Sequence, residues 1–292
     1  MALQFPDRLA AATAARDSRV CVGLDPRPDL LPSTFAQSTA SLAGVTRFCC
    51  GIIDATAQYA VCVKPQAAHF EALAPEGLAA MWQVIAYARK CGLLVILDAK
   101  RSDIGSTAEA YAQACFGRHH QGAVAAVDAV TVNPYLGSDG VEPFIEMADQ
   151  VGGGVFVLTK TSNPSSGELQ DLQTASGTIY QTVARLVNGW GASRIGETGY
   201  SSVGAVVGAT YPQQLGELRE LMPHSIFLVP GYGAQGGAAA DVAGAFDENG
   251  RGAVVNSSRG IIYAYRATGG DYQQAAADAA RTMRDDLNSV LG

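Results

Sequence analysis

The chain has 292 residues, of which 48% are hydrophobic and 16% charged, so it can bury a large core and is not disordered. Its net charge of −7, without a dense Lys/Arg run, argues against nucleic acid as a main partner, although a local cationic site could bind a small anion. No stretch approaches the roughly 20 apolar residues that span a membrane, and the N-terminus lacks the apolar core of a signal peptide.

The six cysteines lie mostly inside apolar segments, and no C-x-x-C pair occurs. This pattern gives little support to a zinc site or a dithiol redox site. It favours buried free thiols in a reducing cytoplasm.

Short apolar segments alternate with amphipathic ones along the whole chain. The predicted strands cover residues 19–24, 60–63, 93–97, 129–132, 154–158, 202–207, 226–229 and 253–255. The predicted helices cover residues 5–15, 41–59, 75–91, 141–149, 179–190, 213–221, 236–245 and 271–291. A further helix is predicted to begin at Ser106, because residues 106–109 have the S-x-x-E form of a capping box. Residues 26–40 and 165–173 are predicted to be polar loops.

Eight strands with helices in nearly every gap predict an α/β fold, a single (β/α)₈ TIM barrel over residues 1–292 with an N-terminal helix. A doubly wound open sheet is the alternative. It would require a glycine-rich first strand–helix turn, whereas that turn here is Asp25-Pro26-Arg27-Pro28.

The most informative stretch covers residues 93–112, in which a buried strand ends in a cluster of charges. If the strand continues to Lys100, alternation places Asp98 and Lys100 on one face, opposite Ala99. A structural salt bridge at the strand end is the alternative to a functional role.

Active sites of such barrels lie at the carboxyl ends of the strands. The polar residues that follow the predicted strands are Asp25, Lys64, Asp98, Lys100, Asp103, Asn133, residues 159–162, residues 230–237, Ser258 and Arg259. They include lysines and carboxylates but no histidine or cysteine, so proton transfer would have to come from lysine or carboxylate.

The last two strand ends suggest a phosphate site. Residues 231–237 are glycine-rich and precede a predicted helix whose N–H groups could bind an anion. Arg259, after the next strand, would add a cation. A glycine hinge without a ligand is the alternative for this segment.

Seven sequence blocks at these strand ends resemble the orotidine 5′-phosphate decarboxylase family, in its longer bacterial subfamily. The blocks are GLDPRP at 23–28, VKPQAAHFE at 63–71, LDAKRSDIGSTA at 97–108, NPYLGSDGVEPF at 133–144, TKTSNPSS at 159–166, VPGYGAQGG at 229–237 and SSRGIIY at 257–263.

The resemblance implies a role for each matching residue. Lys64, Asp98, Lys100 and Asp103 match a catalytic Lys-Asp-Lys-Asp network. The implied substrate-binding residues are Asp25 (with Lys64, near the ribose), Ile104 and Thr107, Ser162 (the pyrimidine), and Pro230, Gln235, Ser258 and Arg259 (the phosphate). Ser258 departs from the shorter subfamily, which has a glycine before the arginine.

The same resemblance implies decarboxylation of orotidine 5′-phosphate to uridine 5′-phosphate without a metal or cofactor. Lys100 would protonate C6 of the pyrimidine. A homodimer is implied, with Asp103, Ile104 and Thr107 reaching the neighbouring subunit's site. Cytoplasmic pyrimidine biosynthesis is the implied setting.

Two rival functions share parts of this pattern. A magnesium-dependent sugar-phosphate barrel, such as a hexulose-phosphate synthase, shares D-x-K-x-x-D but has an acidic metal ligand where this chain has Lys64. A catalytically silent nucleotide-binding barrel would not need two lysines and two carboxylates together.

Overall fold

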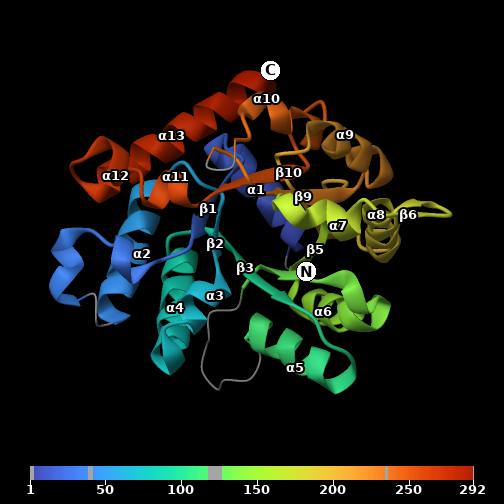
Figure 1. The fold of residues 1–292 in the computed structure, drawn as a ribbon, viewed down its shortest axis with the longest axis horizontal. Coiled ribbons are helices and arrows are strands. Elements are labelled where there is room, and N and C mark those ends of the chain that lie inside the picture. Colours follow the sequence, from blue (N-terminus) through green and yellow to red (C-terminus); the bar gives the residue numbers. More distant parts are fainter. Residues whose placement is uncertain (1–2, 39–41, 118–126, 234–235, 292) are drawn as a thin grey trace.

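A closed barrel of eight parallel strands forms the centre of the computed structural model, which describes residues 3–38, 42–117, 127–233 and 236–291. The strands are joined in the order β1-β10-β9-β8-β5-β4-β3-β2, and helices surround them (Figure 1). The barrel strands are β1 (Val20–Leu24), β2 (Cys62–Pro65), β3 (Leu94–Arg101), β4 (Ala129–Val132), β5 (Gly154–Lys160), β8 (Ser201–Val207), β9 (Ser225–Val229) and β10 (Ala253–Ser257). The predicted barrel fold is therefore confirmed.

The barrel strands form because they are short, rich in valine and buried on both faces. The helices around them are amphipathic; in α2, Val45, Phe48, Cys49, Ile52 and Ile53 recur at helical spacing and are buried. The longer helices are α1 (Phe5–Arg16), α2 (Leu42–Thr56), α4 (Ala74–Lys90), α5 (Gly105–Phe116), α6 (Ser138–Val151), α8 (Ile179–Gly191), α9 (Pro212–Leu221) and α13 (Tyr272–Leu291).

Helix α1 lies at the amino-terminal end of the barrel, away from the predicted site. Phe5 packs edge-to-face on Phe156, with ring centroids 5.8 Å apart. Phe5 and Leu9 belong to the same buried cluster as the barrel residues Cys21, Ile96 and Phe156. Because α1 covers the amino-terminal end of the barrel, the interior is accessible from the carboxyl-terminal end of the strands.

Strand β3 carries an irregularity at the point where its charged residues begin. Leu97 pairs with Val130 and Arg101 pairs with Val132, so four steps along β3 match two steps along β4. Asp98 and Lys100 lie within the extra length, and Lys100 has a φ of +48°. The strand therefore continues past residue 97 and through Lys100, the longer of the two extents considered from the sequence.

Several predicted boundaries are wrong for identifiable reasons. Helix α5 begins at Gly105 with Ile104 as its N-cap, so Ser106 lies inside the first turn and makes no capping hydrogen bond. The helix predicted over residues 236–245 is observed as α10 (Ala239–Val242) followed by the 3₁₀ turn η5 (Ala243–Ala245). It begins only at Ala239, because the backbone of Ala238 is extended, with a ψ of 171°.

The structure also contains short elements that the sequence pattern did not predict. They are α3 (Ala67–Glu71), α7 (Gly167–Gln170), the hairpin β6 (Gln173–Thr174) and β7 (Gly177–Thr178), α11 (Arg259–Ile262), α12 (Tyr265–Thr268) and the 3₁₀ turns η1 (Pro28–Leu30), η2 (Ser33–Ser38), η3 (Pro134–Leu136) and η4 (Pro164–Ser166). Most of them lie in loops at the carboxyl ends of the strands, so they shape the mouth of the barrel. Across the described segments, no helix is both long and apolar enough to cross a bilayer.

Candidate active site

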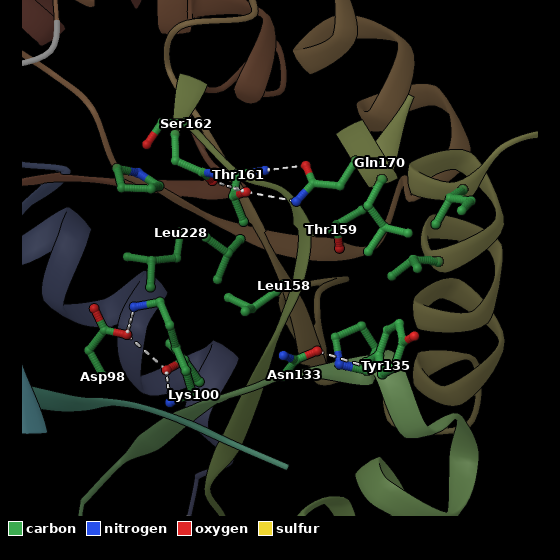
Figure 2. A pocket seen from close by; sticks show the side chains of 18 of the residues that line it. Asp98, Lys100, Asn133, Tyr135, Leu158, Thr159, Thr161, Ser162, Gln170 and Leu228 are labelled. Carbon is green, nitrogen blue, oxygen red and sulfur yellow. Dashed lines mark hydrogen bonds and ion pairs between the residues drawn. The ribbon is translucent and has the colours of Figure 1, made fainter. Parts of the chain in front are cut away.

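A cavity of about 660 Å³ opens at the carboxyl ends of the strands. This volume is in the range that encloses a small organic ligand. Leu158, Val206 and Leu228 form apolar parts of its wall, and Figure 2 shows Asp98 and Lys100 on the side opposite Thr161, Ser162 and Gln170. Of the predicted site residues, Lys64, Asp98, Lys100, Ser162 and Pro230 line the cavity.

Asp98 is the centre of the charged cluster. One carboxylate oxygen, Oδ2, lies 2.7 Å from the Lys64 ammonium, and the other, Oδ1, lies 2.5 Å from the Lys100 ammonium. The side chain of Gln66 donates a hydrogen bond to Oδ2 and that of Thr131 donates to Oδ1, each at 2.9 Å. The two lysines are therefore bound to opposite oxygens of one carboxylate.

The two lysines differ in their access to the cavity. The side chain of Lys64 is 5% exposed, whereas that of Lys100 is 44% exposed. Lys64 is thus enclosed by protein, and Lys100 presents its ammonium group to the open space.

Charge pairing fixes the protonation of the buried members of this cluster. Burial alone would lower the pKa of Lys64, but the nearby Asp98 and Asp25 carboxylates outweigh it and raise that pKa above its ordinary value. Burial would likewise raise the pKa of Asp98, but Lys64 and Lys100 hold it well below its ordinary value. The cluster accordingly keeps a carboxylate and a buried ammonium group in contact at neutral pH.

Asp25 follows β1, and one oxygen of its carboxylate lacks a hydrogen-bond donor among the described residues. This oxygen, Oδ1, is buried. A buried acceptor of this kind is costly unless a ligand supplies the donor.

Asp103, Ile104 and Thr107 are not brought to the cavity of their own chain. Asp103 Oδ1 accepts a hydrogen bond from the Ile104 N–H at 2.9 Å, whereas the ammonium groups of Lys64 and Lys100 pair with Asp98. Ile104 is 55% exposed, and Thr107 is exposed in the first turn of α5. The predicted fourth member of the network is therefore not among the residues that line this cavity in the described chain.

Ser162 is held in place by a close approach of two backbones. A Cβ atom added to Gly208, just after β8, would lie 2.8 Å from the Ser162 Cβ and 3.0 Å from its nitrogen. On the other side, the Thr161 N–H donates to Gln170, whose amide nitrogen donates back to the Thr161 hydroxyl at 2.7 Å. Only glycine at position 208 permits this arrangement without displacement.

Among the predicted phosphate residues that the structure describes, Pro230 lines the cavity, whereas Ser258 and Arg259 do not. Arg259 is the first residue of α11 and is exposed, and Ser258 precedes it. The Ser258 side chain fits because Gly23 has no Cβ; one added there would lie 1.8 Å from the Ser258 hydroxyl oxygen. Gln235 lies outside the described residues.

Sequence reasoning missed three polar residues of this site, Gln66, Thr131 and Gln170. Gln66 directly follows Lys64-Pro65, and a polar residue inside the apolar segment AVTV marks Thr131. These were the available signals. Gln170 lies in a segment predicted to be a loop, and no pattern in that segment pointed toward the cavity.

Comparisons with known proteins agree on one family. Residues 18–269 match the family model described as the orotidine 5′-phosphate decarboxylase / HUMPS family. An orotidine 5′-phosphate decarboxylase from Rhodopirellula baltica is 50% identical over 305 residues, covering 99% of both chains. One from Deinococcus radiodurans is 44% identical, covering 99% of this chain and 98% of the relative. The solved structure of Leishmania donovani OMP decarboxylase superposes with a TM-score of 0.79 at 35% identity, with 99% of each chain covered.

Proposed function

The chain belongs to the orotidine 5′-phosphate decarboxylase family, and we propose that its Lys64–Asp98–Lys100 cluster is the catalytic centre. The protein catalyses the conversion of orotidine 5′-phosphate to uridine 5′-phosphate, a carboxy-lyase reaction of pyrimidine biosynthesis. The observation that carries the assignment is full-length similarity to decarboxylases, at up to 50% identity, in a chain whose barrel mouth holds this cluster.

Lys100 is the proposed proton donor. When the C6–carboxylate bond breaks, CO₂ leaves and the electron pair stays on C6 of the pyrimidine. The ammonium group of Lys100 stabilises this negative charge and transfers a proton to C6, and water returns a proton to the lysine. Greater exposure to the cavity supports Lys100 over Lys64 for this step.

Asp98 and Lys64 are proposed to keep Lys100 charged and correctly placed. The carboxylate of Asp98 contacts both ammonium groups, and its lowered pKa keeps it ionised. A fixed array of charges stabilises a developing anion without the reorganisation that water would need.

Asp25 and Ser162 are proposed to bind the ribose and the pyrimidine. The buried, unpartnered Oδ1 of Asp25 supports this assignment, because a ribose hydroxyl would supply the missing donor. Ser162 lines the cavity opposite Lys100, where a hydroxyl can hydrogen-bond to the edge of the base (Figure 2).

The phosphate is proposed to bind between Pro230, Gln235, Ser258 and Arg259. The loops after the last two strands and the start of the short helix α11 are the usual phosphate position in this fold. Binding energy gained far from C6 would support the chemical step by holding the base against Lys100.

We also propose a homodimer in which Asp103, Ile104 and Thr107 complete the partner's site. The absence of Asp103 from the lining of the cavity in its own chain supports this arrangement. So do exposed apolar side chains nearby, because Ile104, Tyr135 and Leu136 are 55%, 75% and 46% exposed. The Asp103 carbonyl lies close to Gly140 at the start of α6, so this surface extends over both strand-end loops.

The proposed location is the cytoplasm. In the described chain, the cysteines at 21, 49, 50, 62, 91 and 115 are all free thiols. Free buried thiols are typical of a reducing compartment.

Direct mixing with substrate tests the activity. Purified protein is added to orotidine 5′-phosphate, and the loss of the orotate ultraviolet absorbance is followed with and without EDTA. We expect a rapid loss in both samples, with uridine 5′-phosphate as the product. Unchanged absorbance would contradict the function, and a loss abolished by EDTA would favour a metal-dependent reaction.

A further inference from the structure

Thr131 is a buried polar residue in the middle of an apolar strand. It belongs to β4, where its neighbours Val130 and Val132 are fully buried, and it is 1% exposed itself. Its side chain lines the cavity on the same strand that pairs with the irregular part of β3. A hydroxyl group in this position requires hydrogen-bond partners.

The Thr131 hydroxyl has two partners, and both belong to the catalytic cluster. It accepts a hydrogen bond from the Lys100 backbone N–H at 3.0 Å and donates one to Asp98 Oδ1 at 2.9 Å. Because a hydroxyl has a single hydrogen, donation to Asp98 leaves its lone pairs for the Lys100 N–H. The hydroxyl is therefore a donor toward Asp98 and an acceptor toward Lys100.

These contacts close a ring around Lys100. The side-chain ammonium group of Lys100 binds Asp98 Oδ1 directly, and its backbone nitrogen reaches the same oxygen through Thr131. The lysine is thus held at both ends against one carboxylate oxygen.

The backbone of Lys100 shows why a second attachment matters. Its φ of +48° is a conformation that residues other than glycine rarely adopt, and the ladder between β3 and β4 is interrupted here. In this gap the N–H of Lys100 is satisfied by the Thr131 hydroxyl. Strained backbone persists only where surrounding contacts hold it.

We propose that Thr131 is a positioning residue for decarboxylation, which holds the strained backbone of Lys100 and the Asp98 carboxylate in register. The inference rests on the proposed function of Lys100 and adds a residue that acts through it. The hydroxyl does not need to touch the substrate for this role.

Three variants separate the hydroxyl from the shape of the side chain. Thr131→Val keeps the branched shape but removes the hydroxyl, and Thr131→Ser keeps the hydroxyl. Thr56→Val is the matched control, because Thr56 is also fully buried but its hydroxyl donates within α2, to Ile52. Turnover is expressed per binding site, counted by calorimetric titration with uridine 5′-phosphate, so that any unfolded fraction does not enter kcat.

We expect Thr131→Val to lower kcat per site roughly 10- to 100-fold with little change in KM, the scale of a small misplacement of a reacting group. Thr131→Ser should recover most of the turnover, and Thr56→Val should match the parent protein. Parent-like kcat in Thr131→Val, or a Thr131→Ser variant as slow as Thr131→Val, would overturn the proposal.

A structural readout is independent of activity. In a crystal structure of Thr131→Val we expect Lys100 to leave its positive φ or its ammonium group to leave Asp98 Oδ1. An unchanged Lys100 would overturn the proposal even if turnover fell. If the parent protein failed to consume orotidine 5′-phosphate, the proposed function would fail, and this crystal structure would still decide whether Thr131 holds Lys100.

Discussion

Asp98 is the residue on which the other charged groups of the cavity depend. It accepts hydrogen bonds from two ammonium groups, one amide and one hydroxyl, so every lone pair of the carboxylate faces a donor. The sequence predicted Lys64, Asp98 and Lys100 together, because strand ends converge at one edge of a barrel. It did not predict Thr131, because a threonine within a valine-rich strand is equally typical of ordinary strand structure.

The Asp98–Lys64 ion pair is expected to contribute an amount to the free energy of unfolding that does not change with pH around neutrality. The pKa of Asp98 lies below its ordinary 3.8, so its stabilisation is present above that pH and is lost as pH falls through the depressed value. The pKa of Lys64 lies above its ordinary 10.5, so its stabilisation is present below that pH and is lost as pH rises through the raised value.

We therefore expect the difference in unfolding free energy between the parent protein and the double variant Lys64→Met/Asp98→Asn to be constant from about pH 5 to 9. It should decrease outside this range, at both ends. Urea unfolding at a series of pH values measures it. A difference that changes steadily through neutral pH would show that the pair titrates where we expect it to stay charged.

At the scale of elements, an ion pair of the buried Lys160 stabilises the connection between β5 and α8. Lys160 is fully buried at the end of β5, and its ammonium group lies 2.6 Å from the Asp171 carboxylate and 4.5 Å from the centroid of the Tyr211 ring. Asp171 follows Gln170, the residue that holds Thr161. The sequence indicated only a polar loop here, since α7 and the β6–β7 hairpin are too short for a periodic pattern and depend on this tertiary contact.

Removing one partner of this pair should loosen the connection. We expect Asp171→Asn to lower the free energy of unfolding by about 1–3 kcal/mol, because it leaves the buried Lys160 ammonium without a counter-charge. The loss stays in this range because the Asp171 side chain is half exposed, so water already weakens the ion pair. The double variant Lys160→Met/Asp171→Asn should recover most of the loss.

Asp149→Asn is the control for that experiment, because Asp149 pairs with Arg194 at the surface and should contribute under about 1 kcal/mol. Urea unfolding of the four proteins provides the comparison. Equal stability of Asp171→Asn and Asp149→Asn would show that the Lys160–Asp171 pair does not stabilise the connection between β5 and α8.

At the scale of the whole molecule, the barrel brings together groups from strands far apart in the sequence, and we propose that residues 1–292 act as one domain. The barrel itself was predictable because each strand is a short apolar run followed by polar residues. The site was only partly predictable, because some cavity residues, such as Gln170, lie in short loop elements that carry no periodic pattern. Asp103 lies near the cluster in sequence but does not line the cavity of its own chain.

Mixed dimers test whether two chains share each site. Lys100→Ala and Asp103→Ala are each expected to be nearly inactive alone. In a mixed dimer, one site combines both substitutions, and the other combines an intact Lys100 with an intact Asp103. After unfolding and refolding an equal mixture, we expect activity to recover to about one quarter of the parent value, as random pairing into dimers requires.

The control mixes each variant with itself under the same conditions. Parent-like activity of Asp103→Ala alone would contradict the role of Asp103. Absence of recovery in the mixture, with dimer exchange demonstrated by a tagged chain, would place the whole site within one subunit.

The central claim is that the Lys100 ammonium group stabilises and protonates C6, and single-turnover decarboxylation by Lys100→Ala tests it most directly. Lys90→Ala, which changes an exposed lysine at the end of α4, is the matched control. We predict that Lys100→Ala loses nearly all decarboxylation while still binding uridine 5′-phosphate in a calorimetric titration, and that Lys90→Ala behaves like the parent protein. Near-normal decarboxylation by Lys100→Ala would contradict the account.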